Sequence, residues 1–275
     1  MPAALLVGVA ALSLLGHPRR THAPPMADWR QGAAHVAKTL APDELFRVHP
    51  SWDESALPFL VGVQERRSPQ HQPTIGDLHG ASAVVVLTET ERLDEALGRL
   101  PFDAEVASEE SFGEVSVVRV VIPEWARPVE SLRELFERER ARVKVSPRRG
   151  VRVGWREMAE DQRRCIAVDL TGDDPEVTLT FQGVELRRTL RLSAGRDLFS
   201  ARLHGRAKSA RLTSVEVKIA GEDVWSAQIP SLESMWEAVD VDTSTHAGSA
   251  QDVIVTLRAN VSAGQRLCVD GWVLP

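Results

Sequence analysis

Hydrophobic positions recur at helical spacing near the start of the chain and with a period of two over much of its second half. The stretch DWRQGAAHVAKTLAPDELFRVHPSW, residues 28–52, has an apolar stripe that ends at Pro42, and Asp28 stands at the expected N-cap. This spacing predicts an amphipathic helix, because residues three or four apart share one helix face. A short strand, ELFRVHP, and a second helix that begins at Ser51 are predicted to follow.

The rest of the first half alternates between buried strands and helices. ASAVVVL (81–87) is a continuous apolar run, as found in strands buried on both faces. A helix is predicted after it, and EVSVVRVVI (114–122) predicts a last strand. This alternation predicts a small, mostly parallel α/β domain over residues 28–124. An amphipathic helix is predicted in a connecting segment over residues 125–149.

From Cys165 onward, apolar and polar residues alternate. In DVIVTLRANV every second residue from Val253 is apolar, which predicts a strand with one face turned to a core. About eight such segments, including DLFSARLHG (197–205), predict an antiparallel β-sandwich of jelly-roll type over residues 150–275. The predicted fold class is therefore α/β plus all-β, an α/β domain followed by a sandwich.

Residues 1–17 begin with the uncharged sequence MPAALLVGVAALSLLG. Its apolar core would extend about 21 Å as a helix at about 1.5 Å per residue, and a bilayer core is about 30 Å thick. We interpret it as a membrane anchor or a signal segment, followed by a proline-containing linker over residues 18–27; a helix buried in a core is the alternative. The predicted location is the inner membrane with periplasmic domains, or outside the cell, although two arginines follow the apolar run and favour a cytoplasmic side.

The composition is that of a globular protein, with 43% hydrophobic and 26% charged residues. The net charge is −6, and acidic and basic side chains are interspersed instead of forming a basic stripe, so nucleic-acid binding is not predicted. No GxGxxG or P-loop follows a predicted strand, and no cofactor is predicted. HExxH and nucleophile-elbow motifs are also absent from the sequence, so no catalytic residue is predicted.

The chain has two cysteines, Cys165 and Cys268. The first and last strands of many sandwiches lie side by side, which would allow a disulfide that closes a loop of about 100 residues. Two separate thiols that fill apolar positions in different sheets are the alternative. The cysteines form no CxxC pair and no ligand cluster, so no metal site is predicted.

Three tryptophans of the predicted sandwich are candidates for carbohydrate binding: Trp225, Trp236 and Trp272. A flat aromatic ring complements the C–H face of a pyranose, but an aromatic side chain in a strand more often packs in the core. Asp240 and Asp242 would share one face of a predicted strand. A glycosidase needs two carboxylates that converge across a cleft, and spacing alone does not establish this.

A second candidate site is predicted where ELFRVHP ends, with His49, Trp52 and Asp53. In α/β proteins, ligands often bind at strand ends. The alternative is an ordinary strand-to-helix turn in which Asp53 complements the dipole of the following helix.

The sequence GDLHG is similar to the first metal-binding motif of calcineurin-type phosphoesterases, in which an aspartate and a histidine two residues later bind metal. In that family the motif follows a strand, whereas here a proline-containing loop precedes it, and the later motifs of the family are absent. Asp77 and His79 are therefore interpreted as loop residues.

The order of the N-terminal segments resembles one known family. An apolar helix, a linker and DWRQGAAHVAKTLAPDELFRVHPSW, followed by AVVVLTETERLDEALGRLP and FGEVSVVRVVIP, resemble the C-terminal extracytoplasmic region of bacterial dolichyl-phosphate-mannose mannosyltransferase-like membrane glycosyltransferases. The resemblance covers residues 3–122 and implies a small α/β domain that faces the periplasm. The acidic motif and upstream transmembrane helices of that class have no counterpart in this sequence, so no catalytic residue is transferred. The predicted sandwich separately resembles a galactose-binding-like jelly roll.

These patterns predict a non-catalytic, membrane-anchored or exported envelope protein that binds a glycan or a protein partner, such as a membrane glycosyltransferase. The alternatives are a glycosyltransferase fragment or subunit and a glycan-active hydrolase. A cytosolic scaffold with a buried N-terminal helix is a third interpretation.

Overall fold

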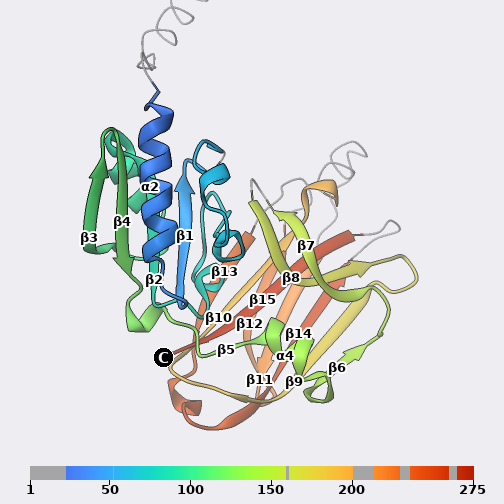
Figure 1. Cartoon of the computed structure of the whole chain (residues 1–275). Coiled ribbons are helices and arrows are strands. Elements are labelled where there is room, and N and C mark those ends of the chain that lie inside the picture. Colours follow the sequence, from blue (N-terminus) through green and yellow to red (C-terminus); the bar gives the residue numbers. More distant parts are fainter. Residues whose placement is uncertain (1–22, 52, 159–160, 201–212, 230–235, 260–264) are drawn as a thin grey trace, which may run out of the picture.

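The computed structural model describes residues 23–51, 53–158, 161–200, 213–229, 236–259 and 265–275. It contains a four-stranded α/β layer and a two-sheet β-sandwich that lies beside it (Figure 1). The predicted anchor or signal segment, residues 1–17, lies outside the described part of the chain. Among the residues that the structure describes, no helix is both long and apolar enough to span a bilayer.

The α/β layer has a sheet with the strand order β1-β2-β4-β3. Its strands are β1 (Glu44–His49), β2 (Ala83–Glu89), β3 (Glu105–Phe112) and β4 (Val115–Val121). Only β1 and β2 pair in parallel, so the expectation of a mostly parallel sheet is wrong. The reason is that β3 and β4 form a hairpin at Gly113 (φ 62°), which returns β4 antiparallel to β2.

Helix α2 (Met26–Thr39) covers one face of this sheet, as Figure 1 shows. Its predicted apolar stripe is present, and Trp29, Ala33 and Val36 pack with the apolar residues of β1, β2 and β4. Asp28 does not cap the helix, because α2 begins two residues earlier; its carboxylate instead accepts a hydrogen bond from the backbone N–H of Glu114 (3.0 Å).

The predicted second helix is reduced to short turns. After β1 the chain forms three 3-10 turns, η1 (Leu57–Phe59), η2 (Gln64–Arg66) and η3 (Ile75–Leu78). Pro58 stands inside η1 and lacks the N–H that a longer helix would require. The helix expected after β2 is present as η4 (Thr90–Arg92) followed by α3 (Leu93–Gly98).

The sandwich consists of two antiparallel sheets, as predicted. The front sheet has the order β13-β10-β15-β8-β7, with β5 paired to β15, and the back sheet has the order β12-β11-β14-β9-β6. The strands are β5 (Glu130–Ser131), β6 (Val143–Ser146), β7 (Val151–Met158), β8 (Asp161–Leu170), β9 (Glu176–Glu185), β10 (Thr189–Arg196), β11 (Thr213–Ile219), β12 (Glu222–Ile229), β13 (Trp236–Asp242), β14 (Ala250–Ala259) and β15 (Gln265–Leu274).

A single hydrophobic core fills the space between the two sheets. The alternation seen around Val253 holds, since the apolar residues of β14 up to Ala259 face this core. The prediction of a strand over residues 197–205 is wrong for the part that the structure describes, residues 197–200. Strand β10 ends at Arg196, and residues 198–200 are helical. Residues 201–205 lie outside the described part.

The segment expected to connect two domains belongs to the sandwich. β5 pairs with β15, β6 pairs with β9, and helix α4 (Leu132–Arg138) packs three apolar side chains into the sandwich core. Helix α4 begins later than expected, with Ser131 as its N-cap instead of Pro128 in its first turn. The boundary of the sandwich therefore lies within the predicted linker, residues 125–149.

The α/β layer and the sandwich share a hydrophobic cluster. Trp272 and Leu274, at the end of β15, pack with Ile75 and Leu78 of η3 and with apolar residues of β2 and β4. This contact holds the segment between η2 and η3 against the front sheet. The candidate site lies along that contact.

Candidate functional site

A groove runs between residues 64–79 of the α/β layer and the front sheet. It consists of three adjoining cavities of about 140, 230 and 560 Å³, which we call the inner, middle and outer cavities. The inner and middle cavities share Gly76, Asp77 and Arg164 as lining residues, and the middle and outer cavities share Pro69 and Trp155. These shared residues show that the three cavities adjoin one another along the groove.

Two side chains of β8 hold the loop wall of the groove in place. The Asp161 carboxylate accepts hydrogen bonds from the backbone N–H groups of His71 and Gln72 (3.0 Å for Gln72). The Arg163 guanidinium donates to the Gln72 carbonyl (2.9 Å) and to the Asp77 carboxylate (2.7 Å). Because Asp161 and Arg163 are both 7% exposed, these ionic hydrogen bonds are shielded from water and fix the loop firmly.

Asp77, the aspartate of the GDLHG sequence, is occupied by structural contacts. Its carboxylate accepts hydrogen bonds from the backbone N–H and the hydroxyl of Thr74 (2.7 and 2.8 Å) at the start of η3. His79 lies 3.6 Å from a Glu134 carboxylate oxygen. No group of three or more metal-ligating side chains occurs among the described residues.

The floor of the inner cavity is the outer face of the front sheet. Ser193 of β10 lies between Ala238 of β13 and Asp270 of β15 in the register of the sheet. The preceding and following residues on these strands, such as Leu192 and Val269, face the sandwich core. Small side chains at Ser193 and Ala238 therefore leave space above the sheet, which the segment Pro73–Asp77 covers.

Asp270 is a buried carboxyl group at this floor and is 4% exposed. Burial raises the pKa of Asp270 to about 7, although the Arg133 guanidinium 3.2 Å away opposes the shift. The charge of Asp77 adds to the increase. Near neutral pH a substantial fraction of Asp270 is protonated, so this carboxyl can donate a hydrogen bond as well as accept one.

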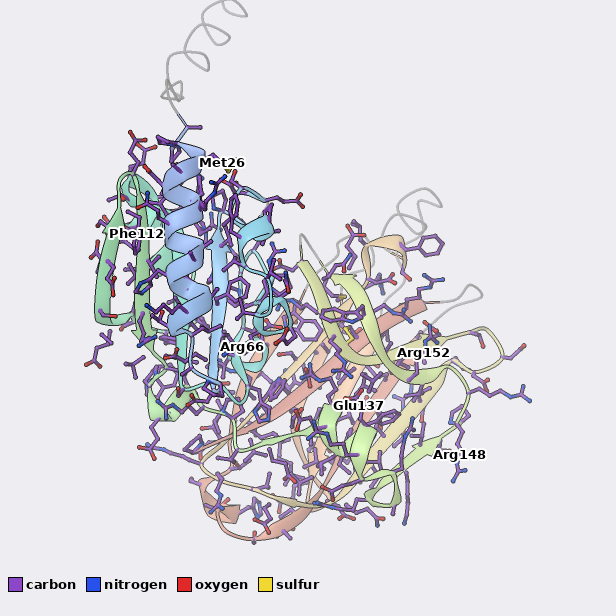
Figure 2. All side chains as sticks on the ribbon, viewed as in Figure 1. Met26, Arg66, Phe112, Glu137, Arg148 and Arg152 are labelled. Carbon is purple, nitrogen blue, oxygen red and sulfur yellow. A yellow bond between two sulfur atoms is a disulfide. The ribbon has the colours of Figure 1, made fainter. Side chains whose placement is uncertain are left out.

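Trp236 forms one wall of the inner cavity. It packs on Met158 and on the disulfide between Cys165 and Cys268, which joins the adjacent strands β8 and β15 (Figure 2). The indole Nε1 of Trp236 and the guanidinium Nε of Arg163 are buried and have no hydrogen-bond partner within the described structure. Buried donors without partners are uncommon in proteins, and both of these belong to residues that line the inner cavity.

Trp155 lies at the other end of the groove, on the edge strand β7, and is 55% exposed. It lines the outer cavity with Ser51, Pro69, Asp161 and Gln162. A half-exposed indole beside the exposed Gln162 amide combines an apolar platform with a hydrogen-bonding group, whereas the Asp161 carboxylate is engaged by the loop. Sequence reasoning missed both β7 and Trp155, although the alternation VRVGW already indicates a strand.

The three predicted carbohydrate-binding tryptophans have different positions. Trp236 lines the inner cavity, whereas Trp225 packs on the sandwich core from β12, in the back sheet, and is not a groove residue. Trp272 cannot serve as the predicted stacking platform for a sugar, because the residue is only 3% exposed. Arg133 and His79 lie against its ring, 4.9 and 5.1 Å from the centroid.

The predicted strand-end site is not assembled by the described residues. His49 is fully buried, its Nε2 lies 3.5 Å from a Glu95 carboxylate oxygen, and burial lowers the pKa of this histidine. Asp53 accepts a hydrogen bond from the backbone N–H of Ser55 (2.9 Å) instead of facing a helix, since no long helix follows. Trp52 lies outside the described residues.

The two carboxylates considered for a glycosidase are each engaged locally. Asp240 of β13 is paired with Arg191 of the neighbouring strand β10, at 2.5 Å. Asp242 accepts a hydrogen bond from the backbone N–H of Ser244 (2.9 Å), and hydrogen bonding by this serine lowers the pKa of Asp242. Both lie on one strand, and neither lines any of the three groove cavities.

Comparison with known proteins yields structural similarities of low score. No protein-family model and no curated protein matches the sequence. The CBM51-2 and INT domains of ZmpB from Clostridium perfringens match with a TM-score of 0.37 and 11% identity over 62% of this chain and 40% of that chain. The CBM51 of a GH95 protein from the same organism, in complex with methyl-galactose, has a TM-score of 0.28 and 11% identity over 44% of this chain and 79% of its own.

A third similar structure, TmCBM61 in complex with β-1,4-galactotriose, has a TM-score of 0.32 and 11% identity over 47% of this chain and 86% of its own. The match with the ZmpB structure spans 40% of that longer chain. Scores and identities of this size do not assign the chain to a family.

Proposed function

We propose that this protein is a non-catalytic, membrane-anchored or exported envelope protein that binds a glycan in the groove between its α/β layer and its sandwich. The resemblance of residues 3–122 to the tail of a membrane glycosyltransferase suggests that such an enzyme is its partner at the membrane. The glycan is the part of the proposal that the structure supports best.

The observation that carries the proposal is the exposed indole of Trp155 at the open end of the groove. Its ring is 55% exposed and lines a cavity of about 560 Å³ together with Asp161 and Gln162. A pyranose has an apolar C–H face and a rim of hydroxyl groups. The apolar face can stack on the indole, while the exposed Gln162 amide can accept hydrogen bonds from the hydroxyls and donate hydrogen bonds to them.

Two features support a location outside the cytoplasm. The apolar residues 1–17 have the character of an anchor or a signal segment. The disulfide between Cys165 and Cys268 is of a kind that persists in oxidising compartments and is rare in the cytosol. Fractionation combined with protease accessibility of the tagged full-length protein tests this part, and a soluble cytoplasmic pool would contradict it.

Glycan binding is tested by screening the full-length protein on a glycan array and measuring the best oligosaccharide by calorimetry. Trp155→Ala is expected to weaken binding at least about ten-fold, roughly 1.4 kcal/mol, because the stacking platform is lost. Trp125→Ala is a matched control, since Trp125 is 53% exposed and lines none of the three groove cavities. Equal losses in both variants, or no binding by the wild type, would overturn the proposal.

A glycan-active hydrolase is the second candidate, because two carboxyl groups, Asp77 and Asp270, line the inner cavity. A carboxyl with a pKa of about 7 beside a second carboxylate is an arrangement that glycosidases use for acid and base catalysis. Release of reducing sugar during prolonged incubation with the bound oligosaccharide, abolished in Asp270→Asn, would favour this function. An intact oligosaccharide after incubation favours binding alone.

A further inference from the structure

We propose that the inner cavity is a subsite for one uncharged pyranose residue, so that the groove recognises the end of a glycan chain. This inference rests on the proposed function and adds the class and position of the sugar that is read. It follows from the size of the cavity, from the polar groups that line it and from the pairing of its charges.

The size of the inner cavity limits what it can hold. Its volume is about 140 Å³, and a cavity of about 150 Å³ binds one benzene ring, so two linked sugars have no room in it. The adjoining middle and outer cavities, of about 230 and 560 Å³, are larger. At most one sugar ring therefore enters the inner cavity, and further residues of the same glycan would lie toward Trp155.

The polar groups that line the inner cavity can recognise a hydroxyl-bearing ring. Ser193 and Asp270 lie on neighbouring strands at its floor, and Trp236 and Arg163 also line it. A partly protonated Asp270 can donate a hydrogen bond to a ring hydroxyl or accept one from it. The Nε1 atom of Trp236 and the Nε atom of Arg163 have no hydrogen-bond partner within the described structure.

The charges around the inner cavity favour an uncharged sugar. Each of the three arginines that line it is already paired: Arg163 with Asp77, Arg164 with Glu137 and Arg191 with Asp240. An anionic sugar would have to break one of these pairs and would approach two carboxyl groups at close range. A hydroxyl-bearing ring needs no such exchange, since it forms hydrogen bonds without adding a buried charge.

The position of Ala238 allows a direct steric test. This residue is exposed on β13 and lines the floor of the inner cavity, so Ala238→Leu fills the cavity without entering the sandwich core. Ala250→Leu, at the exposed start of β14 in the back sheet, is the matched control. Trp236→Phe keeps a six-membered aromatic ring and removes the pyrrole half of the indole with its Nε1 donor.

The experiment measures calorimetric binding of the methyl pyranosides of glucose, galactose and mannose to the full-length protein, with glucuronic acid as a charged comparison. At least one methyl pyranoside is expected to bind. Ala238→Leu is expected to weaken that binding at least about ten-fold and Trp236→Phe at least about five-fold, because part of the cavity wall is lost. Ala250→Leu is expected to leave it unchanged, and glucuronic acid is expected not to compete.

The outcomes separate the two proposals. If an oligosaccharide binds and depends on Trp155, but no methyl pyranoside binds or Ala238→Leu has no effect on it, the subsite inference is overturned and the proposed function stands. If glucuronic acid binds more tightly than the neutral pyranosides, the inference of an uncharged sugar is overturned. If neither oligosaccharides nor monosaccharides bind, both proposals fail.

Discussion

The backbone of Gly76 lies directly against the indole ring of Trp272. A Cβ atom built at Gly76 would be 2.3 Å from Cε2 and Nε1 of Trp272, which is closer than any relaxed contact. Gly76 belongs to the α/β layer and Trp272 to the last strand of the sandwich. This contact therefore sets how closely the roof of the groove approaches the sheet below it.

The first prediction concerns Gly76→Ala. The added methyl group must displace either η3 or the buried Trp272, and overpacking of this kind typically costs about 1–3 kcal/mol. The free energy of unfolding, measured by urea denaturation, is expected to fall by that amount. Gly98→Ala is the control, since a Cβ there meets no atom within 4 Å, and it is expected to keep or raise stability.

A second prediction concerns the disulfide. Cys165 and Cys268 are 103 residues apart in sequence, and a cross-link over such a loop stabilises a protein by about 4–5 kcal/mol in the chain-entropy model. The double variant Cys165→Ala/Cys268→Ala is expected to unfold at correspondingly lower denaturant concentration. In the presence of a reductant the difference from the wild type should largely disappear, and a difference that persists would contradict the entropic explanation.

The third prediction follows from the pKa of Asp270, which burial raises from 3.8 to about 7. Below about pH 4 the carboxyl is protonated in both the folded and the unfolded protein. As pH increases from about 4 toward 7, the unfolded chain releases the proton while the folded protein retains it, so the free energy of unfolding of the wild type falls. Above about pH 7 the carboxyl is ionised in both states, and this contribution no longer changes with pH.

Asp270→Asn has no ionisable group at this position. Its stability relative to the wild type is therefore expected to rise by up to about 4 kcal/mol between about pH 4 and pH 8. Denaturant unfolding of both proteins at several pH values measures this difference. Parallel stability curves for the two proteins would show that Asp270 does not titrate in this range.

A fourth prediction compares two arginines that each bridge two acids. Arg163 is 7% exposed and pairs with Asp77 and Asp161, so Arg163→Met leaves two shielded carboxylates unpaired and is expected to cost about 3–5 kcal/mol. Arg258 pairs with Glu176 and Glu216 on the back sheet, and its side chain is 50% exposed. Arg258→Met is expected to leave the free energy of unfolding nearly unchanged, because solvent screens its exposed ion pairs. Similar unfolding free energies for the two variants would contradict the assigned role of Arg163.

Elements with strong hydrophobic periodicity were predicted well. The stripe of α2 around Val36 and the alternation of β14 around Val255 both face the cores that their patterns indicate. Strand β3 was missed because seven of its eight residues are exposed and three are glutamates, so it carries no apolar pattern. Its position depends on pairing with β4, which is a contact and not a property of its own sequence.

The sequence by itself determined that the second half of the chain is an antiparallel sandwich, because alternation within each strand is a local consequence of burial on one face. Only the tertiary structure decided which tryptophans are accessible. Trp272 and Trp155 are both aromatic residues in strands, yet one is covered by η3 and the other stands at an open edge of the sheet. The groove exists only because loops of the α/β layer are held against the sheet by Asp161 and Arg163, and such long-range contacts leave no periodic signal in the chain.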